Sequence, residues 1–280
     1  MQDSHDSSAF AKRVKKHVIG KRHRFVAIAP LGFEDTLAWE LQNILDSETL
    51  EESAIPHVTA DGKVEFTAKI TDAWKVVAYS RVANRVLMEI ASFKAENFGQ
   101  LEKHTAEIPW ELFLDERGVN LDERRERETS SDVIASPSGR GNPKDERGAE
   151  IVLHTSCKHS RLYHSGAIEE RVLKIIREKT SAQFQKNSNS QPQQSANCHP
   201  RLDRESGMGV EQHLYISLVD DRCTLLLDLA GEELYKRGHN RFVAEAPLKE
   251  TIAAAMIFES LRLTANHPLT TIIDPMAGSG

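Results

Sequence analysis

The chain of 280 residues, with a mass of 31.4 kDa, is long enough for about two domains. Its 39% hydrophobic and 28% charged residues, with a mean hydropathy of -0.46, suit a soluble globular protein and exclude one dominated by disorder or collagen-like repeats. A net charge of -6 excludes an overall electrostatic attraction to nucleic acids, so any such attraction must be local.

Several classes of protein and site find no support in the sequence. No apolar run approaches the roughly 18 residues of a membrane-spanning helix, and the N-terminus lacks the apolar segment of a signal peptide. We therefore expect a cytoplasmic protein without a membrane partner. The cysteines are widely spaced, and neither an H-x-x-x-H nor a G-x-S-x-G spacing occurs, so no metal ligand and no catalytic residue is assigned.

A basic run without an acidic residue lies near the N-terminus. Its members are Lys12, Arg13, Lys15, Lys16, Lys21, Arg22 and Arg24. Two interpretations of this run remain open, a solvated flexible tail and a local contact with RNA.

The first elements alternate between strand and helix patterns. Residues 24–29 predict a short strand, and residues 55–60 and 63–68 predict a hairpin around Asp61-Gly62, a pair that a type I′ turn favours. Between them lies a predicted helix whose apolar stripe is formed by Leu37, Leu41, Ile44 and Leu45.

A second helix and a further strand complete this pattern. Thr71 is a suitable N-cap, the predicted strand covers residues 85–92, and the apolar face of the helix is expected at Trp74, Val77 and Ala78. The resulting order, β-α-β-β-α-β, is that of a ferredoxin-like domain, which we place at residues 24–93. A fold of this kind implies no function by itself.

The middle of the chain predicts ordered elements separated by two inserts. Helices are expected at residues 98–106 and around 109–111, a strand at 150–155, and a helix at 166–179 with one face formed by Ile168, Val172, Ile175 and Ile176. Residues 115–149 and 180–209 combine dense charge or low complexity with no periodicity. We expect both stretches to be disordered inserts.

The last part of the chain begins with a clear hairpin pattern. Residues 213–219 and 223–229 alternate between apolar and polar positions around a short acidic turn. A basic loop at residues 235–241, a helix at 248–261 and a strand at 270–274 follow. The sequence DPMAGSG then resembles the turn between the first strand and the first helix of a doubly wound α/β sheet.

Several separated motifs resemble those of one known family. Near the C-terminus they are, in order, EELYKRGHNR, EAPLKETIAAAM and IIDPMAGSG, and upstream they are RFVAIAPLGFEDTLAWEL, RVANRVLMEIASFKA, IPWELFL, SRLYHSGAIEERV and LYISLVDDRCTLLLDLAGEELYKRG. In order and spacing they resemble the RlmKL family of bacterial 23S rRNA guanine-N2 methyltransferases and their THUMP-containing relatives. The resemblance covers most of residues 24–280 apart from the two inserts.

This resemblance implies an α+β fold in three parts. They are a ferredoxin-like βαββαβ domain at residues 24–93, a THUMP α/β RNA-binding domain at 94–245, and the first strand of a truncated Rossmann-like methyltransferase domain at 246–280.

The resemblance also implies S-adenosyl-L-methionine as the cofactor. In the family the DPMAGSG-like loop contacts this cofactor, and the start of the APLKE-like helix lies beside the same pocket. The implied cofactor-binding residues are Asp274, Pro275, Met276, Ala277, Gly278, Ser279 and Gly280, with Pro247, Leu248, Lys249 and Glu250.

Structured RNA, in the first place 23S rRNA, is the partner that the resemblance implies, because THUMP and ferredoxin-like modules bind RNA in that family. Basic residues on the corresponding elements are the candidates for phosphate contacts. They are Lys158, His159, Arg161, Lys236, Arg237 and Arg241.

One part of the family pattern does not occur in the sequence. The Asn-Pro-Pro-aromatic motif that holds the target amine is absent, and a single strand cannot form a doubly wound sheet. We therefore expect residues 246–280 to be poorly anchored or to dock on the THUMP segment, and the chain alone to be inactive in methylation.

Two functions follow from these considerations. The leading one is the RNA-binding part of an S-adenosyl-L-methionine-dependent rRNA (guanine-N2) methyltransferase. The alternative is a stand-alone RNA-binding or assembly module in which residues 246–280 are a vestige. A sulfur-transfer enzyme of the THUMP class is disfavoured, because its Ser-Gly-Gly phosphate loop does not occur.

Overall fold

The described residues of the protein fall into two compact units. The structure is a computed structural model, and it describes residues 10–45, 54–60, 62–114, 150–187, 211–236 and 248–263. We call residues 12–89 with 227–280 the ferredoxin-like unit, and residues 1–11 with 90–226 the second unit.

The ferredoxin-like unit contains the β-α-β-β-α-β order that the sequence predicts. After the π-helical turn η1 (Lys15–Ile19), its elements are β1 (Arg22–Ile28), α2 (Glu34–Ile44), β2 (His57–Ala60), β3 (Lys63–Lys69), α3 (Ile70–Tyr79) and the first half of β4 (Arg85–Lys94). The strands lie in the order β2-β3-β1-β4, with antiparallel pairing of β1 to β3 and β4 and of β2 to β3. The predicted ferredoxin-like fold is therefore confirmed.

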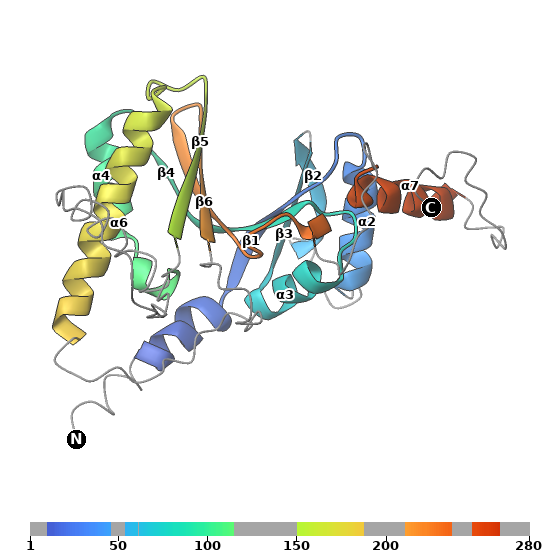
Figure 1. Ribbon diagram of the computed structural model, residues 1–280, viewed down its shortest axis with the longest axis horizontal. Coiled ribbons are helices and arrows are strands. Elements are labelled where there is room, and N and C mark those ends of the chain that lie inside the picture. Colours follow the sequence, from blue (N-terminus) through green and yellow to red (C-terminus); the bar gives the residue numbers. More distant parts are fainter. Residues whose placement is uncertain are drawn as a thin grey trace, which may run out of the picture. The chain divides into compact units, whose positions relative to one another are not determined.

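The core of this unit lies between the sheet and the two helices α2 and α3, which also contact each other (Figure 1). Phe25 of β1 lies directly opposite Phe66 of β3, and their rings stack with centroids 5.3 Å apart. Leu37 and Leu41 of α2 are fully buried, as the helical stripe in the sequence predicts. This burial of apolar area is the main stabilising contribution within the unit.

Helix α3 differs from its prediction in both its start and its buried face. The helix begins at Ile70, directly after β3, so Thr71 lies inside the first turn and is not the N-cap. Its buried residues are Ile70, Ala73 and Val76, whereas the predicted face consisted of Trp74, Val77 and Ala78. The helix therefore starts two residues earlier than a Thr71 cap requires, and the stripe at three-residue spacing that begins at Ile70 is the one that is buried.

The hairpin between β2 and β3 is fastened to helix α2. Gly62 adopts a φ of +72°, a left-handed conformation that glycine adopts at little cost. Its amide donates a hydrogen bond of 2.7 Å to the carboxylate of Glu34, in the first turn of α2, and its carbonyl accepts one of 2.8 Å from the amide of Ala29. The turn therefore ties three elements together; Asp61 lies outside the described residues.

The second unit combines a mixed sheet with two helices. Its elements are the second half of β4, α4 (Phe98–Glu107), η4 (Trp110–Leu112), β5 (Glu150–Lys158), α6 (Ser165–Asn187), β6 (Glu211–Val219) and most of β7 (Arg222–Asp228). The strands follow the order β4-β7-β6-β5, and β5 pairs with β6 in parallel. Helices α4 and α6 pack against each other beside β5 (Figure 1), over a core that includes Leu101, Trp110, Ile168, Val172, Ile176, Leu214, Ile216 and Leu218.

Helix α6 is longer than the sequence predicts, because it runs to Asn187 and enters the stretch 180–209 that was expected to be disordered. Thr180 is 1% exposed and its hydroxyl donates to the carbonyl of Ile176. It thus continues the buried positions Ile168, Val172 and Ile176 at four-residue spacing. The buried stripe therefore continues past the boundary at residue 179 that composition predicted. The stretches 115–149 and 188–209 lie outside the described residues.

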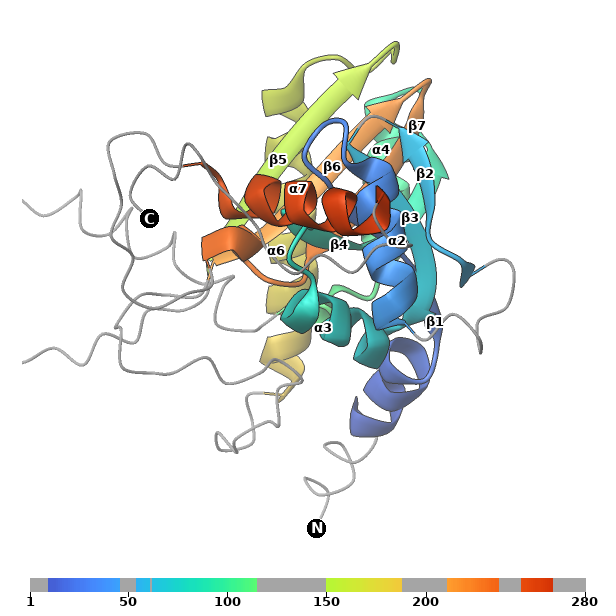
Figure 2. The ribbon, with the colours of Figure 1, turned by 90° about the vertical axis from the view of Figure 1, so that its right-hand side faces the viewer.

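Two elements close to the C-terminus belong to the ferredoxin-like unit. They are the short helix η6 (Leu234–Lys236) and α7 (Glu250–Leu263). Helix α7 crosses α2, as Figure 2 shows. The predicted strand 270–274 lies outside the described residues. No helix within the described part of the chain has both the length and the low polarity that crossing a bilayer requires.

Candidate RNA interface and cofactor-binding segment

The end of β5 forms a tightly bonded corner with the turn between β6 and β7. Lys158 is the last residue of β5, and its carbonyl accepts hydrogen bonds from the Ser160 hydroxyl at 3.0 Å and the Asp220 amide at 3.2 Å. The amide of Asp221 in turn donates to the Ser160 hydroxyl at 3.1 Å. Lys158 and His159 are exposed on this fixed corner, and no ion pair within the described residues joins either of them to a carboxylate. Both can therefore contact a phosphate.

Arg161 is less available than its two neighbours. Its backbone amide donates to the carboxylate of Asp221 at 2.7 Å, and its guanidinium lies 2.6 Å from Glu96 and 3.6 Å from Asp221. Lys94 lies 2.6 Å from the same Glu96 carboxylate. The hydrogen bond from Lys94 and the charge of Arg161 lower the pKa of Glu96, so this carboxylate is ionised at neutral pH. These contacts hold Arg161 at the corner, while its side chain stays 67% exposed.

A cluster of aromatic rings that we did not predict lies on the outer face of β5 and β6. His154 lies opposite Tyr215 in the parallel register, and their rings stack with centroids 4.6 Å apart. The ring of His213 stacks on His154 at 5.2 Å, with 2.9 Å between Nε2 of His154 and Nδ1 of His213. Alternation along β6 had placed His213 and Tyr215 on one face, but nothing in the sequence indicated that β5 would pair there.

The other predicted phosphate contacts lie elsewhere. Lys236 is exposed in η6 and belongs to the ferredoxin-like unit, whereas Lys158, His159 and Arg161 belong to the second unit. Arg237 and Arg241 lie outside the described residues. The structure thus brings together three of the six candidates.

The described part of the predicted cofactor-binding segment is the start of α7. Lys249 lies 3.5 Å from the carboxylate of Glu233 and 4.4 Å from the centre of the Tyr235 ring, so its ammonium is already engaged. Partial burial acts to raise the pKa of Glu233, but the hydrogen bond from Tyr235 and the charge of Lys249 outweigh it and lower that pKa. Leu248 and Glu250 are exposed. Pro247 and the loop Asp274 to Gly280 lie outside the described residues.

Helix α7 is anchored on the ferredoxin-like unit, contrary to the expectation that residues 246–280 would be loose or would dock on the THUMP segment. The hydroxyl of Thr251 donates to the side chain of Asn84 at 2.8 Å, and that of Thr36 donates to Glu259 at 2.6 Å. The rings of Trp39 and Phe258 meet edge to face, with centroids 6.0 Å apart. Apolar and polar contacts with α2 together hold the helix, which the pattern of the isolated α7 sequence did not reveal.

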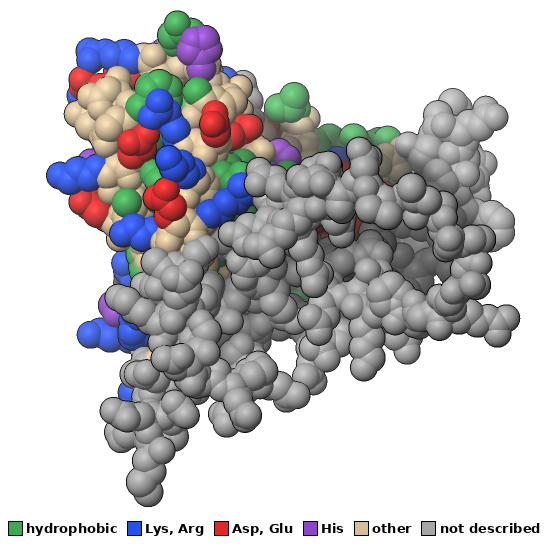
Figure 3. Space-filling view, turned by 60° about the vertical axis from the view of Figure 1, so that its left-hand side comes forward, with side chains coloured by type: hydrophobic (Ala, Val, Ile, Leu, Met, Phe, Trp, Pro, Cys, Tyr) green, Lys and Arg blue, Asp and Glu red, His purple; other side chains and the backbone are tan. Residues whose placement is uncertain are grey.

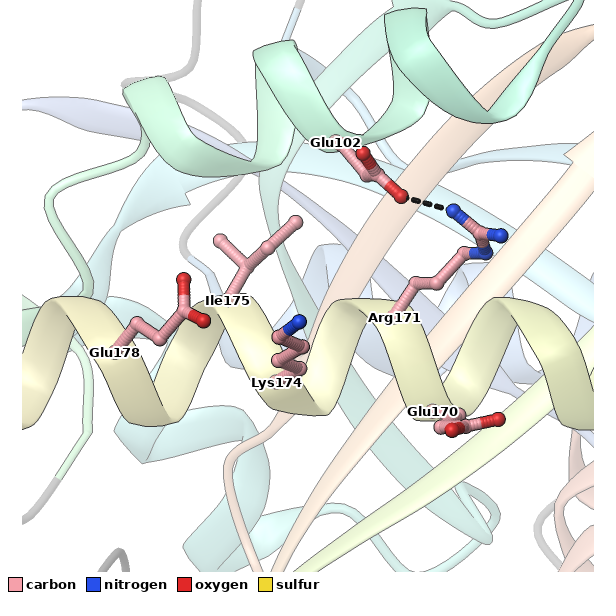
Figure 4. A pocket seen from close by; sticks show the side chains of 6 residues that line it. All are labelled: Glu102, Glu170, Arg171, Lys174, Ile175 and Glu178. Carbon is pink, nitrogen blue, oxygen red and sulfur yellow. Dashed lines mark hydrogen bonds and ion pairs between the residues drawn. The ribbon is translucent and has the colours of Figure 1, made fainter.

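A shallow groove lies between α4 and α6 of the second unit, but its charges do not suit an anion. It is lined by Glu102, Glu170, Arg171, Lys174, Ile175 and Glu178 (Figure 4). The Arg171 guanidinium is occupied by an ion pair with Glu102 and by the ring of Phe98, 4.4 Å away. Figure 3 shows that the described part of this face mixes basic and acidic side chains. It is therefore a weaker candidate for RNA than the end of β5.

The described residues offer neither a metal cluster nor a reactive thiol. No group of three or more His, Cys, Asp or Glu side chains in the described ranges could hold a metal ion. Burial raises the pKa of the Cys223 thiol to about 12, and burial together with the charge of Glu169 raises that of Cys157. Neither thiol is a nucleophile at neutral pH.

Two family profiles match separate parts of the chain. The RlmL ferredoxin-like domain matches residues 24–87, which contain the β-α-β-β-α-β elements, and the RMKL-like methyltransferase domain matches residues 237–280, which contain α7. These matches agree with the resemblance inferred from the sequence motifs.

Curated relatives match most of the chain. The ribosomal RNA large subunit methyltransferase K/L of Syntrophotalea carbinolica is 27% identical over 257 residues, which cover 92% of this chain and 28% of that protein. The putative RNA methyltransferase YpsC of Bacillus subtilis is 28% identical over 260 residues, which cover 93% of this chain and 52% of that protein. The chain thus resembles the RNA methyltransferases of the K/L type and spans about half of their length or less.

Solved structures share the fold. A predicted N6-adenine-specific DNA methylase from Listeria monocytogenes has a TM-score of 0.57 at 24% identity, covering 85% of this chain and 48% of that one. SMU.472, a putative methyltransferase complexed with SAH, has a TM-score of 0.56 at 22% identity, covering 85% of this chain and 49% of that one. At these identities the likeness concerns the mixed α+β fold.

Proposed function

We propose that the chain is the RNA-binding part of an S-adenosyl-L-methionine-dependent rRNA (guanine-N2) methyltransferase. In this proposal residues 94–245 form a THUMP-type RNA-binding domain, and residues 246–280 form the beginning of a Rossmann-like methyltransferase domain. The names of the relatives support the reaction class and make large-subunit rRNA the expected partner.

The observation that carries the proposal is the combination of groups on the outer face of β5 and β6. Alternation along β5 places His154, Ser156 and Lys158 on one face, and the register adds Tyr215 and Ser217 of β6 beside them. Aromatic rings can stack on unpaired bases, hydroxyls can hydrogen-bond to sugars and base edges, and a cation can contact phosphate. This face therefore combines the three types of group that contacts with RNA use.

The cofactor role rests on less of the described structure. S-adenosyl-L-methionine, when bound, supplies a methyl group already activated by a sulfonium. The structure of SMU.472 with SAH supports this cofactor for the fold, and at the start of α7 the exposed Leu248 and Glu250 offer an apolar contact and a hydrogen-bond acceptor. Lys249 holds Glu233 and Tyr235, which gives it an anchoring role.

The alternative function is an RNA-binding module without cofactor chemistry. The docking of α7 on α2 favours it, because the described part of the methyltransferase segment already has a binding surface within the ferredoxin-like unit. The Asn-Pro-Pro-aromatic motif does not occur in the chain, so for these 280 residues on their own we propose RNA binding and not methyl transfer.

Calorimetric titration of the full chain tests both functions. We expect a structured fragment of large-subunit rRNA to bind, with an affinity that falls as the salt concentration rises, because phosphate contacts release counterions. If S-adenosyl-L-methionine also binds, the result favours the part of a methyltransferase over the RNA-binding module without cofactor chemistry. Failure of the RNA to bind at low salt would contradict both.

A further inference from the structure

A cluster of exposed cations lies at the N-terminal end of the ferredoxin-like unit, near η1 and the start of β1. We call it the basic patch, and its members are Lys12, Lys15, Lys16, Lys21, Arg22 and Lys69. The first four lie on or beside η1, Arg22 begins β1, and Lys69 ends β3. The antiparallel register places Arg22 directly opposite Lys69.

These cations are carried by packed elements. Val18 of η1 is 5% exposed, and a ring nitrogen of His23 lies 2.9 Å from its carbonyl oxygen, which joins η1 to β1. The amide of Gly20 donates to the carbonyl of Lys15 at 2.8 Å and closes the helical turn. η1 also contacts α3. The interpretation of this run as a loose solvated tail is therefore disfavoured.

The cations of the basic patch have no ion-pair partner among the residues of the unit that the structure describes. Among the described residues, no ion pair joins a member of the patch to a carboxylate, whereas Arg24, two residues further along β1, lies 2.8 Å from Glu65 and 3.2 Å from Glu89. Like charges directly opposite each other on two strands are destabilising, and Arg22 with Lys69 is such a pair. A bound polyanion would remove this repulsion.

The residues around the basic patch favour the phosphodiester backbone of RNA over a membrane surface as its binding partner. A helix that lies on a membrane needs an exposed apolar face to insert between lipids. Among residues 10–22, however, Phe10 is the one large hydrophobic side chain that is exposed, at 41%, and Val18 is buried, so the segment has no continuous apolar face. Cations alone are sufficient for contacts with the RNA backbone.

We propose that the basic patch is a second RNA-contacting surface, which binds the phosphodiester backbone without reading the bases. The proposal rests on the proposed function, RNA binding, and extends it from the outer face of β5 and β6 to the ferredoxin-like unit. Its contribution is electrostatic, so it adds affinity and salt dependence without sequence specificity.

The test compares variants of the full chain in their binding to a fluorescently labelled RNA hairpin over a range of salt concentrations. The patch variants are Arg22→Gln and the triple variant Lys16→Gln/Arg22→Gln/Lys69→Gln. The matched control is Lys75→Gln, because Lys75 is exposed on α3 of the same unit but lies 3.1 Å from its partner Asp72. Circular dichroism and thermal midpoints check that each variant folds. If the triple variant does not fold, the single variant Arg22→Gln still tests the proposal.

Each lost phosphate contact makes the slope of log affinity against log salt shallower by about 0.7 to 0.9. We therefore expect a slope about one unit shallower for Arg22→Gln and about two units or more for the triple variant, with affinity at low salt reduced about tenfold or more in the latter. The Lys75→Gln control should keep the slope and affinity of the original chain.

The outcomes separate this inference from the proposed function. If the original chain binds RNA and the patch variants have unchanged slopes, the basic patch is not an RNA contact, although the proposed function stands. If the original chain does not bind RNA, both proposals fail. Vesicles of phosphatidylserine and phosphatidylcholine provide the remaining comparison. If the patch variants lose binding to vesicles but not to RNA, the surface serves a membrane and the inference is wrong.

Discussion

Glu40 is a buried carboxylate that organises the connection from α3 to β4. It is 5% exposed and accepts hydrogen bonds of 2.7 Å from the Ser80 hydroxyl, 2.7 Å from the Arg81 amide and 3.2 Å from the Val82 amide. A single side chain thus satisfies three donors of a loop that has no regular secondary structure. Buried donors that lose their acceptor are costly because water cannot replace it.

Replacement of this carboxylate should weaken the ferredoxin-like unit. We expect Glu40→Ala to lower the free energy of unfolding by about 3 kcal/mol, because it leaves buried donors without an acceptor. Urea denaturation measures the change. The control Glu232→Ala removes an exposed glutamate of the same unit and should stay within about 0.5 kcal/mol of the original chain. Equal effects of the two substitutions would contradict the role assigned to Glu40.

Single residues also differ in how far the sequence predicted their roles. Lys158, His159 and Arg161 were equivalent in the sequence, as neighbouring cations after a strand. In the structure Glu96 and Asp221 engage Arg161, whereas the other two remain exposed. The partner carboxylates come from positions 65 residues before and 60 residues after Arg161, so local reasoning could not find them.

At the level of elements, hydrophobic periodicity predicted where individual helices and strands lie. Strong alternation located β6 and β7, and the apolar stripe at Leu37 and Leu41 located α2. What remained hidden was pairing between distant elements. The parallel pairing of β5 with β6 stacks His154 on Tyr215. A parallel pair needs a crossover connection, which is α6 here, so the sequence of neither strand indicates the pairing.

The docking of α7 on α2 is the second arrangement that the sequence did not predict, and it gives a prediction at the scale of elements. A double-mutant cycle of Trp39→Ala and Phe258→Ala should give a coupling energy of about 0.5 to 1.5 kcal/mol, the value usual for an edge-to-face aromatic pair. Urea denaturation of the four proteins measures it.

A matched cycle shows whether this coupling is specific to the pair. Tyr79 is 70% exposed on α3 and makes no ring contact with Phe258 in the described part of the chain. Tyr79→Ala combined with Phe258→Ala should therefore be additive to within about 0.5 kcal/mol. Coupling of the same size in both cycles would mean that α7 is not held by Trp39.

On the scale of the whole molecule, the negative net charge does not reflect two local groups of cations. The chain carries a charge of -6, yet Lys158 and the basic patch each present cations without a carboxylate partner among the described residues. One lies in the second unit and the other in the ferredoxin-like unit. Each unit therefore has its own candidate contact with RNA, and both contacts should weaken with salt.

The central claim is that the outer face of β5 and β6 binds RNA. Its most direct test is ultraviolet cross-linking of the full chain to a thiouridine-labelled fragment of large-subunit rRNA, with the linked peptides identified by mass spectrometry. We expect cross-links in the peptides that contain His154, Lys158 and Tyr215, and we expect unlabelled RNA to compete with them. Cross-links that avoid β5 and β6 and fall instead on the α4 and α6 face around Lys174 would contradict the claim.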